Sequence, residues 1–289
     1  MVRAICIALL LSLPAVAAFA QAQQASAVSG STYAVEQPAL YEMFEAMGMY
    51  EMLPIIAEEH INAAQDMQAG LFPGRGGAAW QARIEEIHDP ARLIALFEEF
   101  FPHDRLSRED VAAVTAFMRS ESGRRLINGE IAARRAFLNA DAMENGQAAL
   151  LLAMETQDIR LETLRAFNEV NDLINRNVSG AMNSRFSLFQ GLADGGAFDD
   201  DMGETLMISD VMAHEPQIRE ATVEWLFSFQ AIAYSNVENA DLEAYVAHSE
   251  SETGQAMIAA LFIAFEELLG TLNYDLGYAA ATYIGGEDL

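Results

Sequence analysis

Lysine is absent from this chain of 289 residues, and cysteine occurs once, at position 6. Cys6 lies in an N-terminal apolar segment that we expect to be removed on export, so the processed chain would contain no cysteine. This excludes disulfides and thiol catalysis for the processed chain. The roughly 270 residues that remain can bury a large core without covalent cross-links.

Positive charge is scarce and unevenly placed. All 16 basic residues are arginine, against 43 acidic residues, so the formal net charge is −27, or −28 once Arg3 is removed. Residues 186–289 carry 19 acidic side chains and a single arginine, Arg219. Such a field repels nucleic acid and anionic lipid surfaces and attracts a cationic partner or divalent cations. A surface that only keeps the chain soluble is the simpler interpretation.

The first twenty residues have the pattern of an export signal. Arg3 provides the positive start, residues 4–18 form an apolar run, and residues 18–20 have the small-x-small pattern of a cleavage site. About 15 apolar residues are too few to cross a bilayer, which needs roughly 20. We therefore expect residues 1–20 to be a signal peptide and the processed protein to be periplasmic or secreted by a Gram-negative bacterium. We expect no membrane span in the processed chain.

Proline is also rare, with seven residues in the chain, and runs of β-branched residues are scarce. Alanine, leucine, methionine and glutamate dominate instead, and these residues favour helices. Apolar residues recur at steps of three and four, for example at Leu93, Leu96, Phe97 and Phe100. The sequence therefore predicts an all-α protein. Residues 21–37 are small and polar, and we expect them to form a flexible lead-in.

The chain contains an internal repeat. Residues 106–133 align without a gap onto residues 237–264, at an offset of 131, and eight of the 28 positions are identical. A period of this length indicates a duplicated unit of domain size and not a solenoid of short repeats. We expect two tandem homologous helical units, residues 38–158 and 159–289. With no glycine- or proline-rich linker between them, they should pack together as one pseudo-symmetric bundle.

Each copy of the repeat contains a serine that suits the start of a helix. Residues 120–123 read Ser-Glu-Ser-Gly, and residues 251–254 read Ser-Glu-Thr-Gly. A serine followed by an acid in the first turn caps a helix, so we expect the chain to bend at Ser120 and at Ser251 and to begin a new helix. The glycine permits the close approach of another backbone. Neither serine lies in a G-x-S-x-G turn, so a catalytic role is the weaker interpretation.

These corners carry a family resemblance. Residues 117–125 and 248–256 resemble the bacterial family called domain of unknown function 2059, present here as two tandem copies. That family tends to have Ser-Pro-x-Gly-Gln at the corner; here Glu121 and Glu252 replace the proline, and Arg124 replaces the glutamine in the first copy. Proline and glutamate both suit the first helical position. The resemblance implies an exported, all-helical envelope protein; the family has no known activity, so no catalytic residue is carried over.

The histidines are the natural place to look for a metal or an acid–base site. Glu85 and His88 are three residues apart, which places a carboxylate and an imidazole on one helix face, as in di-iron bundles. Such a site needs this motif twice, and it occurs once in the chain. We therefore interpret His88 as part of a solvated helix end. His248 occupies the position of Phe117 in the other copy, which favours a packed ring over a ligand.

Two further clusters have structural interpretations. The aspartates at residues 199–201 are adjacent and lack the alternating spacing of a calcium loop, so we interpret them as an acidic loop. The four methionines between residues 43 and 52 fit the core face of a helix better than an adaptable partner surface. Residues 256–265 are the most apolar stretch, and we place them in the core against Leu126, Ile127 and Ile131. We predict no catalytic, metal-binding or cofactor-binding residue.

Together these features favour a non-enzymatic function. We expect an exported helical protein that binds or scaffolds another component of the cell envelope. The alternative is a small-molecule or divalent-cation binder, with its site at the junction of the two copies or at the acidic loop. The weakest hypothesis is a hydrolase, which would require Ser120 or Ser251 to meet His88 or His248 within hydrogen-bond reach.

Overall fold

The structure is a computed structural model, and it describes residues 28–139, 141–198 and 204–284. Every regular element in these residues is a helix, which confirms the predicted all-α class. The helices are, in chain order, α1 (Tyr33–Glu36), α2 (Pro38–Ala46), α3 (Met49–Leu71), α4 (Gly77–Ile87), α5 (Pro90–Phe100), the short 3-10 helix η1 (His103–Arg105), α6 (Arg108–Arg119), α7 (Glu121–Ala136), α8 (Ala142–Glu155), α9 (Arg160–Val170), α10 (Leu173–Asp194), α11 (Glu204–Ala213), α12 (Glu215–Ala233), α13 (Asn239–Glu250) and α14 (Glu252–Ile284).

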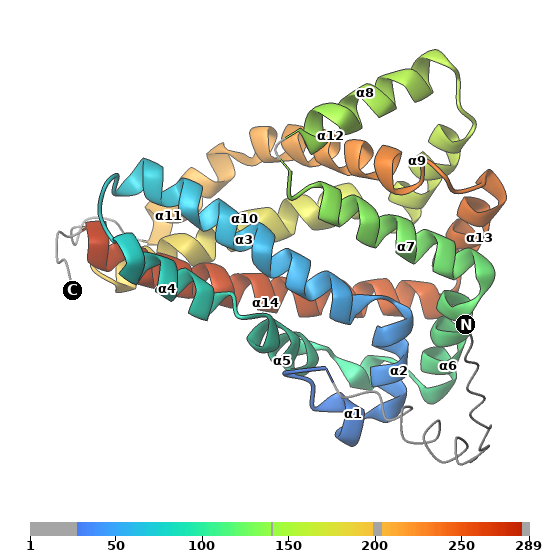
Figure 1. Cartoon of the computed structure of the whole chain (residues 1–289), viewed down its shortest axis with the longest axis horizontal. Helices are drawn as coiled ribbons and strands as arrows, with labels where there is room; N and C mark the ends of the chain where they lie inside the picture. Colours follow the sequence, from blue (N-terminus) through green and yellow to red (C-terminus); the bar gives the residue numbers. More distant parts are fainter. Residues whose placement is uncertain (1–27, 140, 199–203, 285–289) are drawn as a thin grey trace, which may run out of the picture.

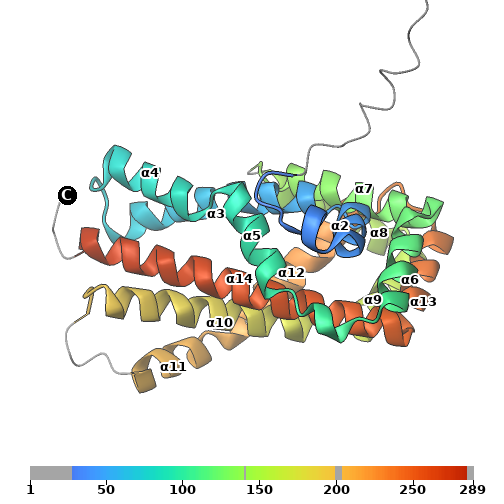
Figure 2. The same cartoon turned by 90° about the horizontal axis from the view of Figure 1, so that it is seen from below.

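The longest helix, α14, organises the molecule. It has 33 residues and runs along the length of the structure (Figure 1). Helix α10 lies beside it over much of that length (Figure 2), and α5, α4 and α6 pack on it from the first half of the chain. The last helix of the sequence therefore lies among helices from both halves.

The two serine corners form as the sequence predicts. Ser120 Oγ accepts a hydrogen bond from the Gly123 amide at 3.0 Å, and Ser251 Oγ accepts one from the Gly254 amide at 3.0 Å. A Cβ added to Gly123 would lie 2.2 Å from the Phe117 carbonyl oxygen, so the bend requires a glycine there. Both serines therefore cap helices, α7 in the first copy and α14 in the second.

The two corners also contact each other reciprocally. Ser122 donates to Asp241 at 2.5 Å, and Thr253 donates to Asp110 at 2.5 Å. The aligned residues Phe117 and His248 also contact each other, and their rings stack with centroids 4.2 Å apart. Each of these contacts joins a residue of one copy to the partner that the offset of 131 requires, so the corners are related by a local two-fold arrangement.

The helices that follow the corners connect the cores of the two copies. Met257, Leu268 and Leu276 of α14 belong to the large core cluster that α2 to α6 form in the first half of the chain. Leu126 and Ala133 of α7 belong instead to a smaller cluster built with α9, α12 and α13. Because α14 lies in the large cluster and α7 contributes residues to both clusters, the two halves pack against each other.

The resemblance between the copies ends beyond the corners. In the first copy the chain leaves helical geometry after Ala136, and α8 then packs on α12, with Gly146 against Ser228. In the second copy α14 continues without a break, and the matching glycine, Gly277, packs on α10 against Leu188. The predicted pseudo-symmetry of the whole bundle therefore stays a prediction.

The expected flexible lead-in is wrong for the part of it that the structure describes. Three groups donate hydrogen bonds to the Glu98 carboxylate: the Ser31 hydroxyl at 2.6 Å, the Thr32 amide at 2.8 Å and the Tyr50 hydroxyl at 2.7 Å. The Tyr33 side chain is buried and donates to the Glu98 carbonyl oxygen at 2.6 Å. A buried carboxylate needs this set of donors, so Glu98 fixes α1 onto α5. Residues 1–27, with the expected signal peptide, lie outside the described residues.

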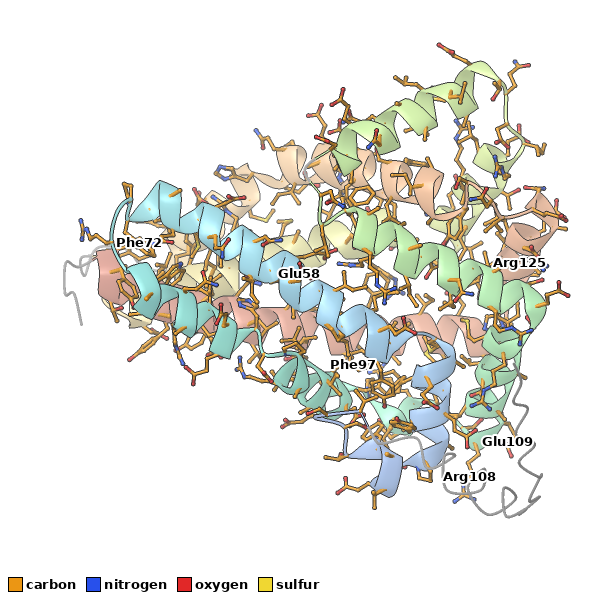
Figure 3. The ribbon with its side chains drawn as sticks, viewed as in Figure 1. Glu58, Phe72, Phe97, Arg108, Glu109 and Arg125 are labelled. Carbon is orange, nitrogen blue, oxygen red and sulfur yellow. The ribbon has the colours of Figure 1, made fainter. Side chains whose placement is uncertain are left out.

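The first unit has a tightly packed aromatic and methionine core. Met43, Met47, Met49 and Met52 are all buried, as their core interpretation predicts. Figure 3 places Phe97 of α5 within this core, and Phe72 near the end of the molecule that is opposite Arg125.

One helix of the described residues, α14, is long and apolar enough to cross a membrane. Buried helices of globular proteins meet the same requirement, so this is weak support for a span. In the structure α14 is packed against α10, α5 and α13. The expectation that the processed chain has no membrane span stays a prediction.

Close packing between α10 and α14 depends on glycine. A Cβ on Gly277 would lie 2.2 Å from the Leu188 carbonyl oxygen, whereas a Cβ on Gly270 would meet only Ser187 Oγ, at 3.5 Å. We expect Gly277→Ala to destabilise the protein by about 2 kcal/mol or more, because the two helices must separate. Urea unfolding measures this change.

Gly270→Ala is the matched control, two turns away on the same helix. It places a methyl group in ordinary contact and removes the helix penalty of glycine, so we expect it to be neutral or stabilising by up to about 1 kcal/mol. Equal destabilisation by the two substitutions would contradict this account of the α10–α14 contact.

Candidate functional site

A cavity of about 450 Å³ lies at the junction of the two copies. Its walls come from α3 and α7 of the first unit and from α9, α10, α12, α13 and α14 of the second. The volume falls in the range of about 300–1,000 Å³ that is typical of small-molecule sites. The position is the one that the alternative hypothesis from the sequence named, the junction between the copies.

Aromatic side chains form much of the cavity wall. Trp225 and Phe229 of α12 stack on each other at 5.2 Å, and Phe262 and Phe265 of α14 line the cavity as well. All four side chains are partly exposed. An apolar ligand that covers these rings would gain hydrophobic free energy in proportion to the area removed from water.

The predicted placement of residues 256–265 is only partly confirmed. Met257 shares the large core with Ile127 and Ile131, as expected. Leu126 lies in the other cluster, and Leu261 with its apolar neighbours on α14 lines the cavity. The apolar pattern of a helix is the same whether its side chains pack in the core or line a cavity. The sequence therefore could not show which of these apolar residues line the cavity.

An acidic group lies in the cavity at Glu130 of α7. Gly129 has no side chain to keep α7 away from α12, and a Cβ there would lie 2.2 Å from the Ala233 carbonyl oxygen. This approach places Glu130 beside Tyr234, whose hydroxyl donates to the carboxylate at 2.7 Å. Burial raises the pKa of Glu130 above its ordinary value, and hydrogen bonds from Tyr234 and Tyr245 act in the opposite direction.

The two tyrosine hydroxyls stay protonated in this setting. Burial, together with the nearby Glu130 charge, raises the pKa of Tyr234 and of Tyr245 well above the ordinary value. Both groups therefore act as hydrogen-bond donors to Glu130 and not as bases. The carboxylate of one copy is held by hydroxyls of the other.

A histidine pair lies beside the cavity. His60 of α3 lines the cavity, and its ring centroid is 5.6 Å from that of His88. Burial, with smaller contributions from His88 and Arg134, lowers the pKa of His60 to about 4, so the ring is neutral at neutral pH. His60 thus adds polar but uncharged surface to the cavity.

The sequence interpretation of His88 as part of a solvated helix end is wrong. The side chain is fully buried, and its Nδ1 is 2.9 Å from the Ile84 carbonyl oxygen. Glu85, three residues earlier, faces the surface and accepts a hydrogen bond from Gln81 at 2.6 Å. The burial of His88 comes from packing against α3, a tertiary contact that helix periodicity does not show.

Two arginines line the cavity in different states. Arg134 of α7 forms a bidentate ion pair with the Glu59 carboxylate, with nitrogen–oxygen distances of 3.0 and 2.6 Å. Arg176 of α10 lies over the Phe262 ring, with its guanidinium carbon 5.2 Å from the ring centroid. Within the described residues the Arg176 guanidinium donates no hydrogen bond, and its Nε is shielded from solvent.

Equivalent positions of the repeat face the same cavity. Glu130 matches Leu261 at the offset of 131, and Arg134 matches Phe265; all four residues line the cavity. The α7 side is therefore charged where the α14 side is apolar. The sequence does contain a signal for Glu130. It is an acidic residue four positions after Leu126, on the apolar face of the helix, and the aligned residue of the second copy is Leu261.

The residues proposed for hydrolysis do not assemble into such a site in the described residues. Ser251 Oγ donates to the backbone carbonyl of His248 at 2.6 Å, not to its ring. Ser120 Oγ is a helix cap, and His88 is packed on His60 at another part of the structure. No serine hydroxyl of the described residues is hydrogen-bonded to an imidazole nitrogen.

The cation hypothesis gains no support either. The described residues contain no group of three histidine, cysteine or acidic side chains that could hold a metal ion. The acidic loop at residues 199–201 lies outside the described residues, so the hypothesis that it binds a cation stays a hypothesis.

No protein-family model, no curated protein and no solved structure matches this chain. The resemblance to domain of unknown function 2059 is thus neither supported nor contradicted and stays a prediction. The function must be argued from the cavity itself.

The buried acid predicts a pH-dependent stability. Glu130→Gln keeps an oxygen that accepts from Tyr234 and removes the charge. The pKa of Glu130 is raised in the folded state, so the free energy of unfolding of the wild type decreases as pH rises through that pKa. Below the pKa of an unfolded glutamate, about 4.3, the side chain is protonated in both states and this decrease is absent. We expect the stability of Glu130→Gln relative to wild type to increase by about 1 kcal/mol between about pH 3.5 and pH 8.

Thermal unfolding of both proteins across this pH range measures the effect. Glu266→Gln is the control, because Glu266 also lines the cavity but is exposed, so its charge is solvated in the folded and unfolded chain. A constant difference between Glu130→Gln and wild type at all pH values would contradict the assignment.

Proposed function

We propose that this protein is an exported, non-enzymatic binding protein that holds a small, largely apolar molecule in the cavity between its two helical units. The observation that carries the proposal is the cavity of about 450 Å³, with partly exposed aromatic side chains on its wall. Exposed aromatic surface in a concave site is the usual mark of a ligand site in a globular protein.

The chemistry of the lining supports binding over catalysis. Glu130 is engaged by tyrosine hydroxyls, and Arg134 is paired with Glu59. His60 is neutral, and among the described lining residues no serine, threonine or cysteine is hydrogen-bonded to a base. A nucleophilic mechanism needs such a pair.

A glycine on the cavity wall offers a direct test. Gly180 lies within α10, lines the cavity, and has no atom within 4 Å of the position of an added Cβ. We expect Gly180→Phe to place a ring in the cavity and to weaken binding of the neutral fluorescent probe N-phenyl-1-naphthylamine by about tenfold or more. Probe fluorescence titration measures the affinity.

Gly70→Phe is the matched control. Gly70 also lies within a helix, α3, with open space around an added Cβ, but it is exposed and is not part of the cavity. We expect it to keep wild-type probe affinity. If wild type fails to bind the probe, or if Gly180→Phe binds it as wild type does, the cavity is not the binding site.

Binding to another envelope component is the second candidate, and a surface feature favours it. Leu151, Leu152 and Met154 of α8, with Ile159 after it, are 55–60% exposed. A group of exposed apolar side chains of this kind is found at protein interaction sites. Photo-crosslinking from position 152 in intact cells should capture one defined protein, and Leu151→Ser should reduce its yield.

The control for this experiment is crosslinking from position 206, which is also an exposed leucine but lies on α11. The same products from positions 152 and 206, or none from either, would remove the support for an interaction surface on α8.

A further inference from the structure

Arg176 differs from the other arginines of the described residues. Arg105, Arg108 and Arg165 also form no ion pair or side-chain hydrogen bond there, but all three are exposed and therefore hydrated. Arg176 is half-buried in the cavity wall, and its Nε is shielded from solvent and without an acceptor. A buried, charged donor without an acceptor costs free energy that a bound acceptor would recover.

The protein does not supply the acceptor. The two acidic residues that line the cavity are engaged by other partners, Glu130 by Tyr234 and Glu266 by the Asn183 amide. Glu59 is paired with Arg134. No carboxylate of the described residues lies within salt-bridge distance of Arg176. The guanidinium therefore faces the cavity as an unneutralised cation.

The surroundings of Arg176 are apolar on the side of α14. Its guanidinium lies on the face of the Phe262 ring. Leu261 and Phe265, close to Phe262 on the same helix, also line the cavity. A cation at one point of an aromatic wall matches a molecule with a single anionic group on an apolar body.

We propose that the ligand of the cavity is an anionic amphiphile, a single carboxylate or similar acidic head on an apolar chain, and that the head binds the Arg176 guanidinium. This inference rests on the proposed function and names the chemical class of its ligand. The planar guanidinium presents parallel N–H groups that match the two oxygens of a carboxylate, which makes it a better partner than a lysine ammonium.

The overall negative charge does not oppose this assignment at the site. The formal net charge of −27 acts over long distances and is screened by salt within about 10 Å at 0.1 M. Inside the cavity the effective dielectric constant is lower, so the nearby guanidinium dominates. The long-range field slows the arrival of an anion without removing the contact.

The test compares three probes with the same twelve-carbon chain and different heads: laurate, dodecanol and dodecyltrimethylammonium. Laurate and dodecyltrimethylammonium are titrated below their micelle concentrations, and dodecanol below its solubility limit, into the full processed chain. Trp225 lies in the cavity wall and reports binding by fluorescence once the only other tryptophan, Trp80, is changed to phenylalanine. We expect laurate to bind about tenfold or more tightly than dodecanol, and dodecyltrimethylammonium to bind most weakly.

Arg176→Gln should lower laurate affinity by about tenfold and bring the ratio of laurate to dodecanol affinity close to one. Arg176→Lys should restore part of the preference, because it keeps the charge but not the planar fork. Arg165→Gln is the matched control, an unpaired arginine on α9 that is exposed and away from the cavity. Circular dichroism and thermal unfolding verify that each variant is folded.

The outcomes separate this inference from the proposed function. Equal affinity of wild type for laurate and dodecanol overturns the anionic assignment and leaves the cavity as an apolar site. Loss of laurate and dodecanol affinity together in Gly180→Phe, with the preference retained in wild type, supports both. If none of the three probes binds wild type, the proposed function fails as well.

Discussion

The reciprocal pairing of the two serine corners is the interaction on which the rest of the structure depends. Asp241 accepts from Ser122 and from the Arg125 guanidinium, while Asp110 accepts from Thr253. The Arg125 and Ser122 contacts hold the pKa of Asp241 below its ordinary value, so the carboxylate stays ionised through the neutral range. Because α7 and α14 both begin at these corners, the pairing sets where each helix enters the core of the other copy.

Close backbone contacts at glycines then fix the positions of those helices. The cavity lies between these contacts. Along α14 the corner is at Gly254, the cavity spans residues 258–269, and the backbone contact with α10 follows at Gly277. On the opposite wall Gly129 brings α7 against the end of α12. Helices that touch at their ends and carry large side chains between cannot close completely, so the cavity follows from the same contacts that stabilise the bundle.

Local chemistry was predictable from the sequence, and tertiary placement was not. Caps such as Ser120 depend on residues within one turn, so the corners were predicted correctly. The burial of His88 and the partial exposure of Phe262 depend on which helix lies opposite, and periodicity reports only that a face is apolar or polar. The packing of α14 in the core of the first half, and of α7 in both clusters, could not be predicted for the same reason. Nothing in the sequence distinguished Arg176 from the exposed arginines.

The repeat acquires a chemical meaning once the cavity is known. The aligned helices α7 and α14 line one cavity, and their aligned positions there differ in kind: Glu130 and Arg134 on α7 occupy the positions of Leu261 and Phe265 on α14. A strictly symmetric pair would have given two like walls, either both apolar or both charged. The difference at these two positions gives one charged wall, on α7, and one apolar wall, on α14. The two copies therefore agree at the corners, where they contact each other, and differ in the side chains that they present to the cavity.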